Sequence, residues 1–393
     1  MSRPNKCAGI FVDLTKAFDT LNHNLLLEKI YKIGLRGKIY EQIKSYMTNR
    51  KQRVKLKESF SNEAIITHGV QQGTILGPLL FLIFINDLYL MNCKANIIGY
   101  ADDKGLLYNG KKWDNLIKEI TYDAMKIFKW FENNGLTVNF NKTYCIFFGC
   151  RFDCIPKSNS IDIKDRDSNN VINIKVVNQV KYLGVIMDSR MKWKIHIREV
   201  LKKTRYMVHS FINLREIFSP HYLKIIYKSL FVSVWNYAIL VWGGTHKSII
   251  KPLEILKKKI IKIILFKPKT YATEILYNIF DVLNVNKMCT ISIIKYIYKN
   301  HLIKLKNETR TPRGNNIYRA LTTKRKDEIN ETCHSFLGPR LINLMPIDLR
   351  KKIIFDAENI DFQLIINWVR TSQSDLIGDM LIYIFKVKNS RIS

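Results

Sequence analysis

Short apolar runs separated by polar segments dominate the first part of the chain. Residues 8–14 form one such run, and residues 96–99 and 104–108 form two more that stand close together in the sequence. Runs of this length and composition, with glycines beside them, are typical of β-strands joined by tight turns. The pattern therefore predicts a sheet in which the last two runs pair as an antiparallel hairpin.

Helical periodicity occurs in two other segments of the same region. Residues 22–33 and 114–133 place apolar side chains at spacings of three and four. Gly34 and Gly135 stand where such helices would end, because a helix commonly stops at a glycine in the left-handed conformation. Strands and helices together predict an α+β fold for residues 1–150, with helices packed on an antiparallel sheet.

The remainder of the chain divides by composition. Residues 151–178 are polar and rich in turn-forming residues, so they are predicted to be a polar loop or insertion. Residues 179–270 begin with a short hairpin pattern and continue as amphipathic helices. Residues 271–393 are predicted to be largely helical, with an interruption around residues 309–316.

Two adjacent acids, Asp102 and Asp103, fall at the tip of the predicted hairpin. Two carboxylates 4 Å apart repel by about 4 kcal/mol at an effective dielectric constant of about 20, so a site that keeps them together commonly supplies a cation. Mg²⁺ prefers oxygen ligands and suits such a pair. The alternative is a solvated Asp-Asp turn that binds nothing.

A third acid, Asp13, lies at the end of the apolar run of residues 8–14 and is expected to face the hairpin tip. Residues 16–20 after it are predicted to open a helix. Three carboxylates on adjacent strands can hold two metal ions about 3.5–4 Å apart, an arrangement that supports phosphoryl transfer. Taken alone, Asp13 is also compatible with a simple cap at a strand end.

The chain also resembles a known family in five ordered blocks. These are residues 11–23, 69–81, 100–103, 139–143 and 181–185. In this order the blocks resemble the reverse transcriptases of non-LTR retrotransposons, of the LINE or jockey type. Further likeness covers residues 193–196, 230–242, 309–310 and 339–346, so the resemblance spans nearly the whole chain.

The resemblance implies a fold and a reaction. Residues 1–150 would form the polymerase palm, residues 179–270 a primer-grip hairpin and a helical thumb, and residues 271–393 a helical C-terminal region. The implied reaction is RNA-directed DNA synthesis, in which a primer 3′-hydroxyl attacks a dNTP with two Mg²⁺ ions, or with Mn²⁺ in their place. The implied partners are an RNA template, a DNA primer, dNTPs and the RNA of the element itself, and no membrane.

The resemblance also implies roles for single residues. The metal ligands would be Asp13, Asp102 and Asp103, with the backbone carbonyl of Leu14 as a further ligand. Lys142 would protonate or neutralise the leaving pyrophosphate. Without the resemblance, Lys142 is equally well explained as a solvated surface lysine.

Nucleotide and primer contacts are implied in the same way. Phe18 would pack under the sugar of the incoming nucleotide and reject a ribose 2′-hydroxyl. Gln72 and Gly73 would let the backbone approach the nascent base pair, because glycine has no Cβ. The primer 3′ end would be held by Tyr182, Leu183 and Gly184. Ordinary core packing for Phe18 and an ordinary strand turn at residues 182–184 are the alternatives.

The chain departs from the family at a few positions. Gln71 replaces a common proline and Thr74 a common serine, which leaves the geometry of this loop less constrained. Lys104 stands where the family often has threonine, and a lysine beside carboxylates is expected to weaken metal binding or to touch a phosphate.

The chain also starts only twelve residues before Asp13, whereas family members carry a fingers region and an endonuclease upstream. The resemblance therefore predicts an N-terminally truncated enzyme, with lost polymerisation as one consequence. A non-catalytic nucleic-acid-binding remnant or co-opted protein is the main alternative. A group II intron-type maturase, which shares the metal hairpin, is a weaker one because the chain shows no C-terminal His-Asn-His nuclease pattern.

Net charge agrees with a partner that carries phosphates. The chain has a formal net charge of +31 and an isoelectric point of about 9.8. Residues 151–270 hold 24 Lys and Arg against 8 Asp and Glu, which is about half of the whole excess. Neutralisation of phosphates gives affinity without sequence preference. Solubility or contact with a membrane surface is the alternative explanation of the charge.

The seven cysteines show no spacing typical of a zinc site and are predicted to be reduced thiols in an intracellular protein. No signal peptide and no membrane-spanning run is expected. Nucleus and cytoplasm are the expected locations. Residues 257–259, three consecutive lysines, are either a nuclear-import signal or part of a basic helix face.

Overall fold

The computed structural model describes residues 6–149, 155–164, 171–303, 320, 322, 334–355 and 361–372. The chain consists of two compact units, Met1–Arg190 and Met191–Ser393. Within the described ranges, no helix is long and apolar enough to cross a membrane.

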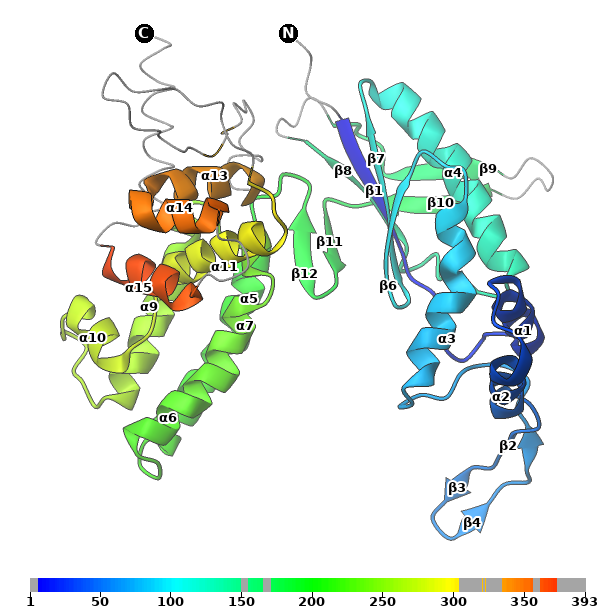
Figure 1. Ribbon diagram of the computed structural model, residues 1–393, viewed down its shortest axis with the longest axis horizontal. Helices are drawn as coiled ribbons and strands as arrows, with labels where there is room; N and C mark the ends of the chain where they lie inside the picture. Colours follow the sequence, from blue (N-terminus) through cyan, green and yellow to red (C-terminus); the bar gives the residue numbers. More distant parts are fainter. Residues whose placement is uncertain are drawn as a thin grey trace. The chain divides into compact units, whose positions relative to one another are not determined.

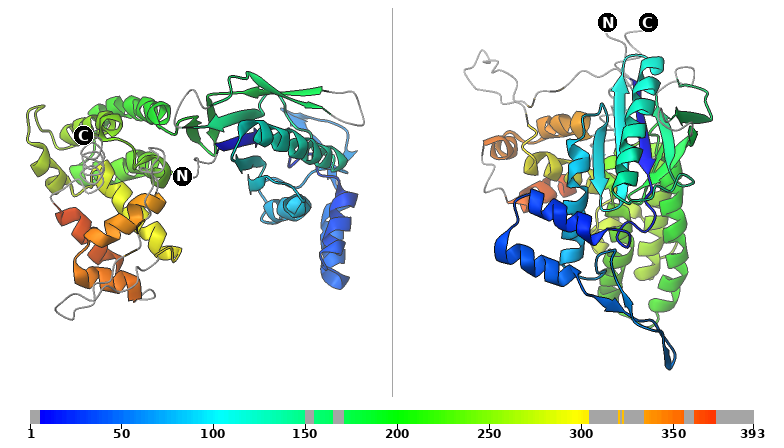
Figure 2. Two further views of the ribbon diagram at one scale, coloured as in Figure 1. Left: turned by 90° about the horizontal axis from the view of Figure 1, so that it is seen from above. Right: turned by 90° about the vertical axis from the view of Figure 1, so that its right-hand side faces the viewer.

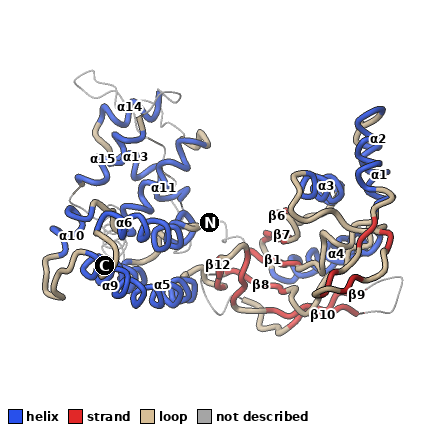
Figure 3. Tube along the Cα trace, turned by 90° about the horizontal axis from the view of Figure 1, so that it is seen from below, coloured by secondary structure: helices blue, strands red, loops and turns tan. Residues whose placement is uncertain are grey.

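A six-stranded sheet forms the centre of the first unit (Figure 1, Figure 3). In spatial order its strands are β6 (Asn96–Tyr100), β7 (Asp103–Gly110), β1 (Lys6–Val12), β8 (Tyr144–Phe148), β10 (Val171–Val176) and β9 (Ser160–Lys164). Neighbouring strands are antiparallel except β8 and β10, which are parallel. The predicted α+β class, the antiparallel sheet and the hairpin of residues 96–108 are confirmed.

Strand β1 lies inside this sheet, paired with β7 on one side and β8 on the other. Ile10 and Val12 are buried in the main hydrophobic core, whereas Phe11 is buried with Ile146 and Val180 in a second cluster. Because successive side chains of a strand point to opposite faces, a strand covered on both faces is apolar at every position. This explains the uninterrupted apolar run in the sequence.

The prediction of a loop over residues 151–178 is wrong for two segments, because β9 and β10 extend the sheet there. Ile161, Ile163 and Ile174 are buried while their neighbours are exposed or half-buried. Only one face of these strands is covered, so five of their eleven residues are polar. Together with the polar residues around the strands, they give residues 151–178 the average composition of a loop.

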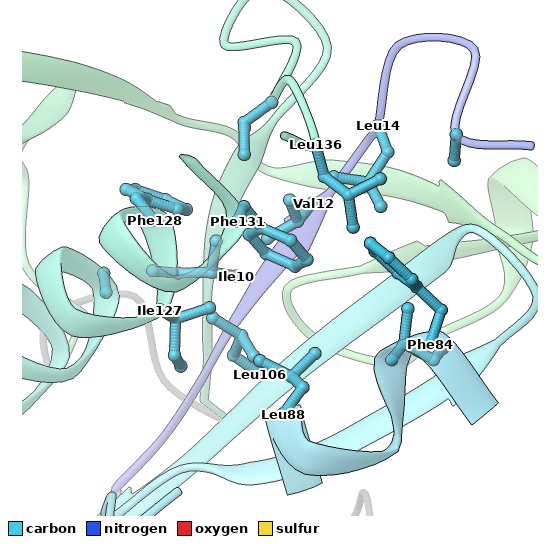
Figure 4. Packing of buried hydrophobic residues seen from close by; sticks show 14 of the residues in the cluster. Ile10, Val12, Leu14, Phe84, Leu88, Leu106, Ile127, Phe128, Phe131 and Leu136 are labelled. Carbon is cyan, nitrogen blue, oxygen red and sulfur yellow. The ribbon is translucent and has the colours of Figure 1, made fainter. Parts of the chain in front are cut away.

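The helices of the first unit pack with the sheet and with one another (Figure 2, Figure 4). They are α1 (His23–Lys32), α2 (Gly37–Met47), α3 (Leu76–Ile85), the short 3-10 helix η1 (Asn86–Leu90) and α4 (Trp113–Asn133). Helix α4 contacts β7 and β9 and buries its apolar stripe, which includes Ile120, Ile127 and Phe131. The predicted helices 22–33 and 114–133 are thus confirmed, and Gly34 and Gly135 follow them with φ of +100° and +68°.

Residues 16–20 form a turn and not the predicted start of a helix. Lys16 has a φ of +48°, outside the right-handed helical region, and its carbonyl accepts a hydrogen bond from Asp19 N at 2.8 Å. The helix begins only at His23, because the side chain of Asn22 accepts a hydrogen bond from Leu25 N at 3.1 Å and caps the helix.

Small two-stranded elements complete the first unit. Strands β2 (Lys51–Gln52) and β5 (Ala64–Ile65) pair, as do β3 (Lys55–Leu56) and β4 (Ser59–Phe60). Strands β11 (Gln179–Tyr182) and β12 (Val185–Asp188) form the hairpin predicted from residue 179 onward. This hairpin belongs to the first unit, whereas the predicted domain of residues 179–270 grouped it with the helices that follow.

The second unit is helical in its described part. Its helices are α5 (Lys194–Leu214), α6 (Pro220–Tyr227), the π-helical segment η3 (Lys228–Val232), α7 (Ser233–Asn236), α8 (Ile239–Trp242), α9 (Lys247–Ile264), α10 (Thr273–Phe280), α11 (Val285–Lys299), α13 (His334–Leu344), α14 (Ile347–Phe355) and α15 (Phe362–Thr371). Helix α5 packs on α9, and α11 packs on α13 and α15. Residues 309–316, which include residues 309–310 and the predicted interruption, lie outside the described residues.

Candidate active site

The adjacent acids lie at the tip of the β6–β7 hairpin, as predicted. Tyr100 pairs with Asp103, so Ala101 and Asp102 are the two turn residues. Ala101 has a φ of +51°, which is unusual for a residue with a Cβ and places local backbone strain at this turn. A two-residue turn fixes where the two carboxylates leave the sheet.

The register of β1 on β7 brings Asp13 to the same place. Val12 pairs with Lys104 in this antiparallel ladder, so one step further along the two strands Asp13 comes opposite Asp103. The backbone N–H of Asp13 donates to Thr143 Oγ1 at 3.4 Å, and its carbonyl accepts from Asn139 N at 2.8 Å. Asp13 is therefore held between the hairpin and the segment that leads into β8.

The bridge next to Asp13 involves Leu14 and Val138. Its backbone bonds run from Thr15 N to Thr137 O at 2.9 Å and from Asn139 N to Asp13 O, and neither uses the carbonyl of Leu14.

A cavity of about 630 Å³ opens beside these carboxylates. Asp13, Asp103, Lys142 and Tyr182 all line it, together with Tyr144 and the segment from Val177 to Lys181. Four of the residues implied by the resemblance thus share one cavity. Asp102, Phe18, Gln72 and Gly73 are not among the residues that line it.

Asp103 lies in an environment that disfavours its negative charge. The pKa of Asp103 is raised above its ordinary value, first by burial and then by the negative charges of Asp102 and Asp13, while Lys104 opposes the shift. A raised carboxyl pKa means that the ionised form lacks a sufficient counter-charge. A divalent cation would supply that charge.

The donor set suits such a cation, because hard divalent metals prefer carboxylate and carbonyl oxygens. Within the part of the chain that the structure describes, however, no three His, Cys, Asp or Glu side chains converge closely enough to form a metal-binding group. The chemistry of the donors therefore fits a metal site, and the carboxylates are near one another without being closed around a common point.

Lys104 is buried beneath the hairpin and not directed at the cavity. Its Nζ donates to the carbonyl of Ala101 in the turn and lies 5.5 Å from the centroid of the Phe81 ring on α3. Burial lowers its pKa to about 8, against the opposing effect of Asp102 and Asp103. The residue that departs from the family pattern therefore ties the strained turn to the sheet.

Tyr182 reaches the cavity from the β11–β12 hairpin. It pairs with Val185 across a two-residue turn, in which Leu183 and Gly184 have φ of +45° and +77°. Both values are positive, as a type I′ turn requires, and this accounts for glycine at position 184. The ring of Tyr182 lies 4.9 Å from that of Phe11, which fixes its place beside β1.

The hydroxyl of Tyr182 is buried, and no residue in the described part of the chain accepts or donates a hydrogen bond to it. Burial raises its pKa, and the charge of Asp103 raises it further. An unsatisfied buried hydroxyl beside a cavity suits a ligand that offers it a polar partner.

Phe18, Gln72 and Gly73 lie together in a second place. The ring of Phe18 is half-buried and stacks on Phe81 at 4.4 Å, so the alternative of core packing holds for at least one face of the ring. Gln72 donates through Nε2 to Asp19 at 2.9 Å, and the backbone bond from Val70 N to Phe18 O, 2.8 Å long, joins the two blocks. Gly73 has a φ of +80° and open space around it.

Two features of the site had been given no role from the sequence. Thr143, which receives the hydrogen bond from Asp13, is fully buried, and residues 177–181 supply much of the cavity wall. The apolar alternation of residues 171–180 was the available sequence signal for the second feature, since it shows a strand leading directly into the hairpin.

Comparison with known proteins gives one family. Residues 1–187 match the family model described as reverse transcriptase (RNA-dependent DNA polymerase). A probable RNA-directed DNA polymerase from transposon BS of Drosophila melanogaster is 25% identical over 66% of this chain and 29% of its own length. The RNA-directed DNA polymerase from the mobile element jockey of the same species is 26% identical over 67% of this chain and 29% of its own length.

The chain therefore spans less than a third of the length of these relatives. Among solved structures, a telomerase from Candida albicans in complex with a TWJ fragment of telomeric RNA shares 16% identity with a TM-score of 0.37, covering 94% of this chain and 50% of that one. Ordered sequence blocks, family model and relatives agree, and residues 1–187 form a reverse transcriptase domain of the non-LTR retrotransposon type.

Proposed function

We propose that this chain is an RNA-directed DNA polymerase that joins a dNTP to a primer 3′-hydroxyl on an RNA template. The proposal rests on the family of residues 1–187 and on one structural observation. The β1–β7 register brings Asp13 opposite Asp103 at the hairpin tip, beside a cavity that Lys142 and Tyr182 also line. The DNA primer, the dNTPs and the RNA of the element as substrates and partners belong to this proposal.

The proposed metal ligands are Asp13, Asp102 and Asp103 with the carbonyl of Leu14, for two Mg²⁺ ions or Mn²⁺ in their place. When bound, such ions lower the pKa of the attacking hydroxyl and neutralise the charge of the triphosphate. The pKa of Asp103, which is raised first by burial and then by the charges of Asp102 and Asp13, supports this assignment. We further propose that loading with metal and substrate draws the three carboxylates together.

The other side chains would then position the substrates. Lys142 is exposed at the rim of the cavity and would meet the leaving pyrophosphate with its positive charge. The buried hydroxyl of Tyr182 would donate to the primer strand, and the Leu183-Gly184 turn would hold the primer end. Gln72 and Gly73 would face the nascent base pair, since the exposed glycine backbone leaves room for a base.

Primer extension by the full chain tests the proposed function. We expect a labelled DNA primer on an RNA template to gain only the templated nucleotide, and only in the presence of Mg²⁺ or Mn²⁺. No extension at a protein concentration that saturates the primer–template would contradict the proposal.

A non-catalytic nucleic-acid-binding protein is the second candidate. It is favoured by the incomplete convergence of the carboxylates in the described residues and by the net charge of +31. Salt-sensitive binding of RNA without nucleotide addition would support it. A group II intron-type maturase is less favoured, because the relatives found are retrotransposon polymerases. Nucleus and cytoplasm are the proposed locations, as both reverse transcription and insertion require access to nucleic acid.

Phe18 is predicted to set sugar selectivity. Replacing Phe18 by Ala should increase incorporation of ribonucleotides relative to deoxyribonucleotides by roughly 10- to 100-fold, because one steric contact contributes about 1–3 kcal/mol of discrimination. Single-nucleotide incorporation with dNTP and rNTP measures this ratio. Phe81→Leu, which alters the ring packed beneath Phe18, serves as the matched control. Unchanged selectivity in the Phe18→Ala variant would remove Phe18 from this role.

A basic stripe on α5 is predicted to carry the contacts with the nucleic-acid backbone. Arg198, Lys202, Arg205 and His209 follow one another at helical spacing and are exposed. Arg205 and His209 line a groove of about 480 Å³ with Lys259 of α9. We propose that this stripe tracks the phosphates of the template–primer duplex.

Neutralising Lys202, Arg205 and Lys259 to Gln should lower the slope of log affinity against log salt by about 2 to 3, since each lost phosphate contact removes about 0.9. Fluorescence anisotropy with a template–primer duplex at several salt concentrations measures the slope. The control replaces Lys267, Lys269 and Lys299, three exposed lysines of the same unit, by Gln. Equal slopes in the two variants would place the contacts elsewhere.

A further inference from the structure

A narrow β-ribbon extends from the first unit beyond α2, as Figure 1 shows. We call residues 50–66 the basic ribbon. Lys51 pairs with Ile65 at its base and Lys55 with Phe60 near its tip, and the turn between them consists of Lys57 and Glu58. Hydrogen bonds between Val54 and Ser61, both 2.9 Å long, connect the two pairs of strands. The ribbon is therefore a continuous structure.

Positive charge is concentrated on this ribbon. Its first half carries five basic residues within eight positions, Arg50, Lys51, Arg53, Lys55 and Lys57. Of the two acids in the ribbon, Glu63 forms a salt bridge with Lys51 at 3.2 Å and Glu58 is in the turn. The charges of Arg53 and Lys55 are thus not paired with a carboxylate in the described salt bridges.

An exposed aromatic ring lies between these cations. Phe60 is 51% exposed, although it is opposite Lys55 in the ladder. The guanidinium of Arg53 lies 4.5 Å from the centroid of its ring and Nζ of Lys55 lies 5.3 Å from it. Arg53 and Lys55 are two positions apart in the strand, so these two cations and the ring lie on the same face of the ribbon.

The apolar side chains of the ribbon are not buried in the core of the protein. Val54, Leu56 and Ile65 are 61%, 75% and 68% exposed, and none of them belongs to the buried core. Exposed apolar side chains gathered on one small element commonly mark an interaction site. A partner that binds these apolar side chains must also interact favourably with the excess of positive charge beside them.

We propose that the basic ribbon binds single-stranded nucleic acid, with a base stacked on Phe60 and the flanking phosphates on Arg53 and Lys55. Unpaired bases stack on exposed aromatic rings and on guanidinium planes, whereas the bases of a duplex are already stacked on each other. The combination of an aromatic ring with flanking cations therefore favours a single strand over a duplex. This binding surface is separate from the carboxylate site, so the proposal does not depend on polymerisation.

Site-specific cross-linking tests the location directly. A photoreactive benzoylphenylalanine placed at position 60 of the full chain should cross-link to labelled oligouridylate, and unlabelled single strand should compete better than duplex. The same residue at position 122 is the matched control. Tyr122 is also 51% exposed and also has a lysine, Lys126, 4.3 Å from its ring. Equal yields at positions 60 and 122, or no yield at 60 with oligouridylate fully bound, would overturn the proposal.

Affinity variants test the chemistry. Phe60→Ala should weaken binding of oligouridylate by roughly 10-fold, Phe60→Trp should keep it, and binding of duplex should change little. The double variant Arg53→Glu, Lys55→Glu should weaken binding of oligouridylate further. Its control is the double variant Lys111→Glu, Lys112→Glu, which makes the same charge change at exposed positions before α4. A Phe60→Ala variant that binds single strands as tightly as the parent would contradict the stacking role. An equal loss for single strand and duplex would assign the ribbon to general charge attraction instead.

Discussion

Replacing Asp102 or Asp103 by Asn is expected to lower templated nucleotide incorporation by roughly 100- to 1,000-fold, the cost commonly found when one charge-stabilising group of an active site is removed. Affinity for the primer–template should remain nearly unchanged. The reason is that each substitution removes a negative charge from a site that must hold cations, in a chain whose net charge of +31 already attracts polyanions.

Incorporation and binding must be measured on the same samples to separate these effects. Asp114→Asn is a matched control, because it removes one exposed carboxylate from the first turn of α4. An equal loss of incorporation and of binding in the Asp102→Asn variant would show that this residue supports the fold and not the reaction.

Lys257 is predicted to make the stability of the second unit depend on pH. Its side chain is fully buried, donates to the carbonyl of Leu283, and lies 5.5 Å from the ring of Trp235. Burial lowers its pKa from an ordinary 10.5 to about 8, although the charge of Glu254 opposes the shift. Below pH 8 the folded chain therefore carries a buried ammonium, whose desolvation costs free energy.

Between pH 8 and pH 10.5 the unfolded chain binds more protons at this position than the folded chain, so the contribution of Lys257 to the free energy of unfolding rises with pH. Replacing Lys257 by Met removes this rise. The free energy of unfolding of the variant minus that of the parent should fall by about 3 kcal/mol from pH 8 to pH 10.5, at about 1.4 kcal/mol per unit of pKa shift.

Denaturant unfolding followed by tryptophan fluorescence measures this difference, since Trp193, Trp235, Trp242 and Trp368 lie in the second unit. Taking the difference between variant and parent cancels the titration of buried thiols and phenols at high pH. Lys259→Met changes the same charge at an exposed position of α9 and is the control. A difference that stays constant with pH would mean that Lys257 is not buried as a charged group.

The central part of the fold follows from local patterns in the sequence. Residues 8–12 are apolar at every position because β1 is covered on both faces, and an uninterrupted apolar run of this kind is typical of a buried strand. The hairpin of residues 96–108 was likewise predictable, because the apolar runs of residues 96–99 and 104–108 are separated by only four residues and such a short connection favours an antiparallel hairpin. The sequence predicts that Asp13 faces the hairpin tip, whereas the register that brings it opposite Asp103 is known from the structure.

Strands β9 and β10 were not predicted for a physical reason. Their residues alternate between one covered and one open face, so in Ser160–Lys164 three of the five residues are polar. Average composition then indicates a loop, and only the period of two reveals the strand. The turn at residues 16–20 was missed because the cap at Asn22 sets the start of the helix at His23, after these residues.

The site residues that belong to the ordered sequence blocks were predictable. Asp13, Asp103, Lys142 and Tyr182 were named from the sequence and share one cavity. The buried position of Lys104 was not predicted, although the sequence contains the information for it. Side chains alternate between the two faces along β7, so the residue after Asp103 must point away from the cavity. A lysine can occupy a buried position only where neighbouring groups interact with its ammonium. For Lys104 these groups are the carbonyl of Ala101 and the ring of Phe81.

The central claim is that the carboxylates at the hairpin tip serve a metal-dependent polymerase site. Single-turnover incorporation on an RNA template, measured over a range of Mg²⁺ concentrations for the parent chain and for the Asp102→Asn, Asp103→Asn double variant, tests it most directly. We predict saturable Mg²⁺-dependent incorporation by the parent, and none by the double variant at equal occupancy of the primer–template. Equal incorporation by both chains would contradict the claim, as would the absence of incorporation by a parent chain fully bound to its template.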